Sequence, residues 1–169
     1  MILWLALSLF LSGNAAPADT SLPESFDWSF PVKAWKADSG SFSRGQGHWS
    51  LVFFFSPSCG HCHKAWPVVE EWNRRYASRG LHVEAVASGY ANAQDLGYFE
   101  QDMMGIFPFP VYHDTGKVLG ERMRIRSVPT FFLVDPAGNY LRWFGSYPAT
   151  LDAIEGTIAR EFRTRRSRL

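Results

Sequence analysis

Residues 49–63 read WSLVFFFSPSCGHCH, and the fold can be inferred outward from these residues. Its first seven residues form an apolar, aromatic run that ends at a Ser-Pro-Ser turn. Such a run predicts a strand that is buried on both faces of a sheet. The chain has only two cysteines, Cys59 and Cys62, and both lie directly after this strand. The end of the strand is therefore the first place to look for chemistry.

Apolar periodicity predicts the elements around this strand. We expect a helix to run from the cysteines to a stop at Gly80, because its apolar residues recur at helical spacing. Residues 135–139 read DPAGN, which is a strong hairpin signal between two strands. The pattern as a whole predicts an α/β fold with a central mixed β-sheet flanked by helices. Further strands are expected at 26–30, 81–87, 109–112, 130–134 and 140–144, and further helices at 93–104, 117–123 and 151–162.

Length and composition favour one globular domain, since the chain has 169 residues, of which 46% are hydrophobic and 20% charged. A net charge of +1 gives no general attraction to nucleic acid, so we expect no nucleic-acid partner. We expect a signal peptide at 1–18, a lead-in segment at 19–47, the main domain at 48–162 and a basic tail at 163–169. The apolar run 2–11 and the small residues after it predict export, to the periplasm or another extracytoplasmic space. The alternatives are an uncleaved segment that anchors the chain in a membrane and a buried helix. Separately, the arginine-rich tail is expected to remain solvated, with a weak contact to anionic lipid as the alternative.

The cysteine pair is expected to perform redox chemistry. At a strand–helix junction, unpaired N–H groups and the positive end of the helix dipole face the first sulfur. Together with a protonated His61, they are expected to lower the pKa of Cys59 from about 8.5 to about 4–7, which favours the nucleophilic thiolate. Cys59 would then attack a substrate disulfide, and Cys62, one turn deeper, would resolve the mixed disulfide. An inert structural disulfide is the alternative, but so short a loop would stabilise the fold little.

The same residues also form a CxxCH sequence, which is the attachment signature of c-type haem. Its position after a buried strand in an α/β pattern argues against haem. A metal site would need the two cysteines together with nearby histidines. We therefore expect no cofactor other than the redox-active Cys59–Cys62 disulfide. The candidate ligands would be His63, Met103, Met104 and Met123 for haem, and His48, His61 and His63 for a metal.

These features resemble the thioredoxin superfamily over roughly residues 48–162. The resemblance rests on the Phe-rich strand, the CGHC sequence, Pro67 and the sequence SVPT at 127–130. It implies that Pro67 kinks the active-site helix and that Val128-Pro129 forms a cis-proline loop against the cysteines. The backbone of Val128 would then pair with an extended substrate. The implied catalytic residues are Cys59, Cys62, His61 and Pro129, and the implied substrate contacts are Val128, Gly60 and Trp66.

Several branches of the superfamily are similar to the chain. A signal segment and an extra βα unit between the cysteine helix and the proline loop resemble the exported TlpA/ResA-like branch. The CGHC sequence is typical of disulfide isomerases, and thioredoxin-like proteins of conjugative-transfer systems are also similar. Two positions depart from the family, since Phe53 and Ala65 stand where relatives carry a buried acid. The proton acceptor for Cys62 therefore stays open between His61, His63 and a water.

We expect an enzyme that exchanges disulfides with exported protein substrates and works with a membrane redox partner. His61 favours an oxidase or isomerase, with a potential near about −180 mV against about −270 mV for thioredoxin. The TlpA-like layout favours a dedicated reductase, for instance in cytochrome c maturation. A non-catalytic module that binds unfolded or pilin-like clients is a third possibility. Such a groove would use exposed aromatic residues, for which Trp28, Trp35 and Trp66 are candidates, although core packing is commoner for tryptophan.

Overall fold

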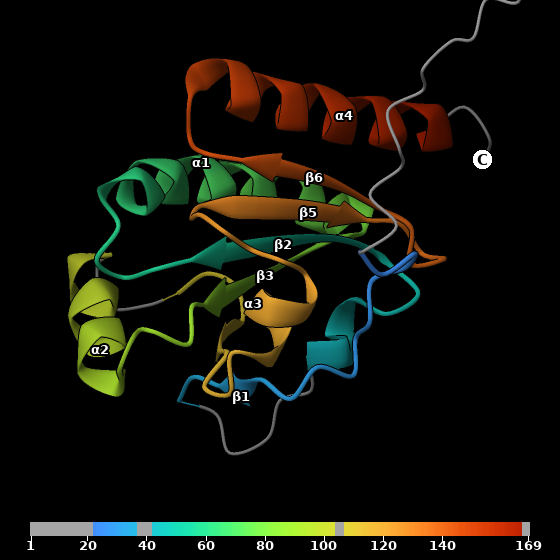
Figure 1. The fold of residues 1–169 in the computed structure, drawn as a ribbon. Helices are drawn as coiled ribbons and strands as arrows, with labels where there is room; N and C mark the ends of the chain where they lie inside the picture. Colours follow the sequence, from blue (N-terminus) through green and yellow to red (C-terminus); the bar gives the residue numbers. More distant parts are fainter. Residues whose placement is uncertain (1–21, 37–41, 104–106, 167–169) are drawn as a thin grey trace, which may run out of the picture.

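The computed structural model describes residues 22–36, 42–103 and 107–166. The expected signal peptide at 1–18, Met104 and the last three tail residues lie outside these ranges. Six strands form one mixed sheet in the order β1-β4-β3-β2-β5-β6 (Figure 1). β2, β3 and β4 are parallel, whereas β1, β5 and β6 run antiparallel to their neighbours. The strands are β1 Lys33–Ala34, β2 Trp49–Phe55, β3 Leu81–Ala87, β4 Val111–His113, β5 Thr130–Val134 and β6 Tyr140–Phe144.

The helices complete the expected α/β architecture, which is confirmed. They are α1 Gly60–Tyr76, α2 Ala93–Asp102, α3 Val118–Arg122 and α4 Pro148–Arg166, with 3-10 turns at Phe42–Gly45 and Ala77–Arg79. Gly80 ends the second of these turns in the left-handed conformation, with φ of 95°, which glycine adopts without a steric cost. Two strand–helix pairs, β3–α2 and β4–α3, lie between α1 and β5. That one of them is an insertion relative to other thioredoxins stays a prediction.

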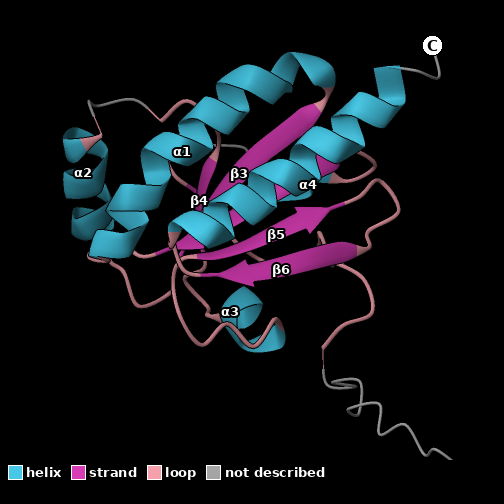
Figure 2. Ribbon diagram, turned by 90° about the horizontal axis from the view of Figure 1, so that it is seen from above, coloured by secondary structure: helices cyan, strands magenta, loops and turns pink. Residues whose placement is uncertain are grey.

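The sheet separates two apolar cores. The first core contains apolar residues of α1, α2 and α4, while α3 packs on the opposite face (Figure 1). Viewed from above, α1 and α4 both run across the sheet (Figure 2). β2 contributes to both cores, because Phe53 and Phe55 face the first and Val52 and Phe54 face the second. The expectation that this strand is buried on both faces is confirmed.

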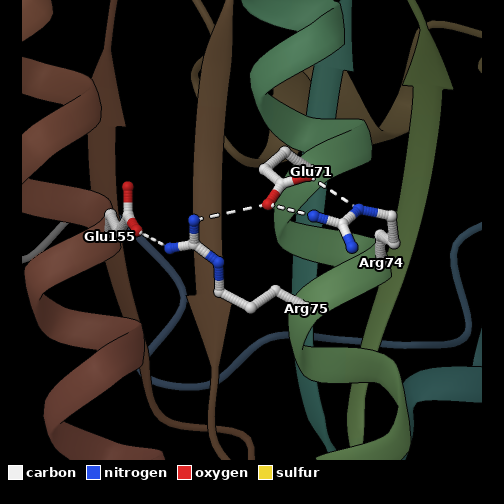
Figure 3. Close-up of polar contacts among 4 residues, drawn as sticks. All are labelled: Glu71, Arg74, Arg75 and Glu155. Atoms are coloured by element: carbon white, nitrogen blue, oxygen red, sulfur yellow. Dashed lines mark hydrogen bonds and ion pairs between the residues drawn. The ribbon is translucent and has the colours of Figure 1, made fainter.

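Charged residues join α1 to α4 on their outer surface (Figure 3). The Glu71 carboxylate accepts hydrogen bonds from Arg74 at 2.7 Å and from Arg75 at 3.3 Å. Arg75 also forms an ion pair with Glu155 of α4. These residues are exposed or half-buried, so the network orients the helix surfaces while stabilising the fold little.

One predicted strand is wrong. Residues 26–30 form no strand, although Phe26, Trp28 and Phe30 are buried in the second core. The Phe26 ring lies 5.7 Å from that of Phe132 in β5, and its N–H donates to the carbonyl of Gly138 at 2.8 Å. The apolar alternation therefore reflects an irregular segment that covers one face of the sheet.

Several predicted boundaries also change, and the expected helices at 93–104 and 117–123 are observed as Ala93–Asp102 and Val118–Arg122. The strand expected at 109–112 is observed two residues later as β4, because Pro108 and Pro110 have no N–H to donate to a ladder. The last helix is longer than the predicted 151–162, so residues 163–166 of the expected basic tail are helical. Apolar periodicity did not predict the first and last turns of α4, because it detects only the part of a helix that carries an apolar face. None of the helices in the described part of the chain combines the length and apolar character needed to cross a bilayer.

Candidate active site

Cys59 occupies the junction between β2 and α1. It is the N-cap residue of α1, with extended backbone angles of φ −91° and ψ 110°. Its N–H donates to the carbonyl of Ser56 at 3.0 Å, and its own carbonyl accepts the N–H groups of Cys62 and His63. The first N–H groups of a helix have no helical acceptor and carry the positive end of its dipole. Cys59 therefore lies where a negative charge on sulfur is favoured.

The two thiols differ in access to solvent. Cys59 is half-buried, whereas Cys62 is fully buried, and neither is in a disulfide. Burial raises the pKa of the Cys62 thiol well above its usual range, and the backbone N–H of Ser56 opposes this shift only in part. Cys62 therefore keeps its proton at neutral pH until a base removes it.

The predicted proline loop lies against the cysteines. The Val128–Pro129 peptide bond is cis, as expected. The Cys59 thiol donates to the carbonyl oxygen of Val128 at an S···O distance of 3.6 Å. Two hydrogen bonds hold the loop, from Thr130 Oγ1 to the carbonyl of Ser127 at 2.7 Å and from the N–H of Gly145 to the carbonyl of Pro129 at 2.9 Å.

The sequence model of the thioredoxin-like domain matches residues 42–155. The chain belongs to the thioredoxin-like domain family. No curated protein sequence matches this thioredoxin-like chain.

Solved structures share the fold of this thioredoxin-like chain. A thiol:disulfide interchange protein DsbE of Chlorobium tepidum is 24% identical with a TM-score of 0.69, over 84% of this chain and 99% of that one. A secreted Mycobacterium tuberculosis disulfide oxidoreductase is 16% identical with a TM-score of 0.63, over 76% and 93%. A protein disulfide isomerase of Bacteroides thetaiotaomicron is 14% identical with a TM-score of 0.70, over 84% and 90%. At these identities the likeness concerns the fold alone.

His63 is fixed as a hydrogen-bond donor. Its Nε2 lies 2.7 Å from the carbonyl oxygen of Pro57. Because a carbonyl only accepts, Nε2 must carry the proton. The ring also packs edge-on against Phe99, with 4.8 Å between centroids. Nε2 is therefore not a base for Cys62, and His63 ties the first turn of α1 to the loop before Cys59.

The residues of this thioredoxin-like chain do not fit a c-type haem. Attachment needs both cysteine sulfurs and a free histidine nitrogen, but Cys62 is fully buried and His63 Nε2 is engaged. The proposed distal ligand Met123 is buried in the second core, and Met103 packs against the first.

A metal site also lacks support. His48 lies at the opposite end of β2 from the cysteines, and its ring centroid is 4.6 Å from that of His82. Among the residues that the structure describes, no group of three His, Cys, Asp or Glu side chains is arranged to hold a metal ion.

The two positions at which related proteins carry an acidic residue are apolar and buried in this chain. Phe53 is fully buried and stacks on Phe131, with 5.0 Å between ring centroids. Ala65 in α1 is also fully buried. Neither position brings a carboxylate to Cys62. The group that accepts the Cys62 proton therefore stays a prediction, with His61 or a water as candidates besides His63.

The expected substrate contacts have different outcomes. Gly60 and His61 are exposed beside Cys59, and Val128 is half-buried. Trp66 is fully buried, and its indole Nε1 donates to Glu70 at 2.7 Å. Its expected place in a substrate groove is therefore wrong. Of the other tryptophans considered for a groove, Trp28 is buried in the second core and Trp35 is half-buried. The Trp66 ring packs in the first core among Phe53, Phe55, Phe99, Phe107 and Phe109.

Sequence reasoning missed Tyr147, in the loop between β6 and α4. Its side chain is 67% exposed, and its ring centroid lies 6.2 Å from that of His61. The ring also covers Gly145, since a Cβ at that glycine would lie 3.2 Å from Tyr147 Cδ2. An aromatic residue directly before the proline that opens α4 was the available signal. Tyr147 places an apolar surface beside the exposed histidine of the CGHC sequence.

Glu84 of β3 was also missed. Its side chain is 1% exposed, and neither carboxylate oxygen accepts a hydrogen bond of normal geometry in the described structure. Burial raises the pKa of Glu84 to about 8, although the N–H of Gly45 and the charge of Arg44 oppose this. A glutamate in a strand covered on both faces was the signal. It faces the second core, on the opposite side of the sheet from Cys62.

Proposed function

We propose that this chain is an extracytoplasmic thiol–disulfide oxidoreductase that exchanges disulfides with protein substrates. The observation that carries the proposal is the arrangement of two free thiols at a helix N-terminus. Cys59 is accessible and lies beside the Val128 carbonyl, while Cys62 is buried one turn behind it. This is the asymmetry that a nucleophile and a resolving thiol require.

The reaction proceeds in two exchange steps. The Cys59 thiolate attacks one sulfur of the substrate disulfide, so a mixed disulfide forms and the other substrate sulfur leaves as a thiolate. Cys62 then loses its proton and attacks Cys59 Sγ, which breaks the mixed disulfide and releases the second substrate thiolate. Two electrons pass from the cysteine pair to the substrate, and Cys59 and Cys62 end as a disulfide. The reverse sequence oxidises a substrate dithiol.

We infer that oxidation or isomerisation is the favoured direction. His61 is exposed next to Cys59, where its protonated ring would stabilise the thiolate and hence the reduced form of the enzyme. A dedicated reductase is the alternative, and a membrane redox partner would serve either direction. The apolar segment 2–11 supports export, and one protein of the same fold is described as secreted.

The reduction potential tests the proposal. The mature protein is equilibrated in a series of glutathione buffers, its thiols are trapped by alkylation, and the fraction of Cys59–Cys62 disulfide is fitted. A potential near about −180 mV supports an oxidase or isomerase, whereas one near about −270 mV supports the reductase. A His61→Ala variant should have a lower potential than wild type, because the thiolate loses a neighbouring charge. A chain that forms no disulfide in any buffer would overturn the proposal.

A further inference from the structure

A cavity of about 290 Å³ opens beside the proline loop, at the carboxyl ends of β2 and β3. We call it the basic cavity, because Lys117, Arg124 and Arg126 line it together with Phe54 and Tyr90. We propose that the basic cavity binds a carboxylate carried by the disulfide substrate one to three residues from its reactive sulfur. The inference rests on the proposed function and specifies its substrates as anionic around the cysteine.

The cavity lies within reach of a substrate bound to Cys59. Ligands of open α/β sheets bind outside the carboxyl ends of the strands. The carboxyl ends of β2 and β3 both lie at this cavity. Ser88, which lines the cavity, donates its N–H to the carbonyl of Phe55 at 2.7 Å. Arg126 precedes Val128 by two residues, so their Cα atoms are at most about 7 Å apart. A substrate residue one to three positions from the cysteine covers that span.

Two basic side chains of the cavity are not neutralised by its acidic residues and can pair with a ligand carboxylate. Two acids also line the cavity, but Asp114 is 1% exposed and accepts the N–H groups of Leu119 and Gly120 at 3.2 and 2.9 Å. Its charge is thus satisfied by the backbone of α3, and Glu121 remains exposed at the rim. Lys117 and Arg126 form no side-chain hydrogen bond or ion pair within the described residues.

Tyr90 gives one of these cations a fixed place. The Lys117 Nζ lies 4.0 Å from the centroid of the Tyr90 ring, and that ring is 83% exposed. In a cation–π contact some ammonium hydrogens face the ring, and at least one of the three points away from it and can donate to a carboxylate.

The backbone around the cavity is unusually constrained. Lys117 and Arg124 have φ values of 58° and 47°, in the left-handed region that side chains other than glycine rarely adopt. They are two of only three such residues in the described chain. Gly89 allows the close approach, because a Cβ there would lie 2.2 Å from the carbonyl oxygen of Asp114 and 2.6 Å from Lys117 Cγ. Strain of this kind concentrates at ligand sites.

Exchange kinetics with charged peptides test the inference. Three peptide disulfides are compared, with Glu, Gln or Lys at the positions that flank the cysteine. For wild type we expect kcat/KM to fall in the order Glu, Gln, Lys, and the preference to weaken with salt. Lys117→Gln and Arg126→Gln should each lower the Glu-to-Gln ratio by about three- to fivefold, as expected for a solvent-accessible ion pair. Glu121→Gln should raise the ratio. Glutathione disulfide, assayed in parallel, shows whether a small anionic disulfide uses the same cations.

A matched variant separates the cavity from overall charge. Arg79→Gln removes the same charge beside the amino end of β3, a seven-residue strand away, and should leave the ratio as in wild type. If Arg79→Gln lowers the Glu-to-Gln ratio of kcat/KM equally, or if wild type shows no charge preference, the proposed role of the basic cavity is wrong. The proposed exchange activity is unaffected by either result. If wild type exchanges with none of the disulfides, the proposed function fails. An acidic peptide with serine in place of cysteine then tests carboxylate binding by the cavity alone. Chemical-shift changes at Lys117 and Arg126 on adding this peptide support binding, and their absence contradicts it.

Discussion

The Sγ atom of Cys59 lies 3.6 Å from the carbonyl oxygen of Val128 and donates to it as a thiol. A thiolate has no hydrogen to donate, so ionisation of Cys59 removes this contact. The carbonyl of Val128 then becomes available to an N–H of an extended substrate. Under the proposed function, activation of the nucleophile and exposure of the expected substrate-binding acceptor would therefore be the same event.

Single cysteine variants should separate the roles of the two thiols. Cys62→Ser should accumulate a mixed disulfide between Cys59 and a substrate peptide, because nothing resolves it. Cys59→Ser should accumulate none, since Cys62 is fully buried and cannot reach a substrate. Mass spectrometry of acid-quenched reactions measures both products. Equal trapping by the two variants would contradict the assignment.

The resolving step should depend steeply on pH. Burial raises the pKa of Cys62, so its thiolate fraction grows about tenfold per pH unit through the neutral range. Stopped-flow measurement of the second step between pH 6 and about 9 should follow this slope. His63→Ala should keep the slope, because Nε2 already donates to Pro57. A plateau at neutral pH in wild type, absent in His63→Ala, would identify His63 as the base after all.

Glu84→Gln should stabilise the fold increasingly as pH rises. The ordinary pKa of 4.5 applies in the unfolded chain, whereas the folded value is about 8. Between these values only the folded chain holds the proton, so wild-type stability falls with rising pH by up to about 1.4 kcal/mol per unit. The variant removes this loss, and urea unfolding at pH 5 and pH 8 measures the difference. Glu24→Gln, at an exposed position, should show no such trend.

Substitution of Trp66 should affect stability rather than substrate binding. The side chain is fully buried, so Trp66→Ala should lower the free energy of unfolding by about 3–5 kcal/mol. Trp66→Phe keeps most of the packing and should leave the KM for a peptide disulfide unchanged. A raised KM in a well-folded Trp66→Phe variant would restore the predicted substrate contact.

The central strand was predictable because burial on both faces gives a nearly continuous apolar run, interrupted only by the buried Ser50. The hairpin between β5 and β6 was equally clear from DPAGN. By contrast, Phe26 and Trp28 alternate as in a strand without forming one. Alternation reports which side chains are buried, and an irregular segment that covers a sheet produces it as well. Backbone pairing depends on neighbours that are distant in sequence.

The cysteine pair was predictable because its two residues are separated by only two positions in the sequence. Trp66 could not be placed in the same way, since position 66 is near the cysteines in sequence but turned into the core by the helix. The basic cavity could not be predicted from the sequence, because its lining residues are far apart along the chain. Phe54, Tyr90 and Arg126 come from three separate segments. The parallel pairing of β2 with β3 brings Phe54 near Tyr90, and the antiparallel pairing of β2 with β5 brings Arg126 to the same edge.

The N-terminal aromatic segment has a consequence for synthesis of the chain. Phe26 packs against Phe132 and Tyr140, and the Tyr140 hydroxyl donates to the carbonyl of Pro23 at 2.8 Å. These partners are made more than a hundred residues later. At about 5–20 residues per second, the ribosome delivers them about 6–23 s after Phe26. Throughout that interval Phe26 has only partners that are near it in sequence, so the growing chain exposes apolar surface of the kind that leads to aggregation.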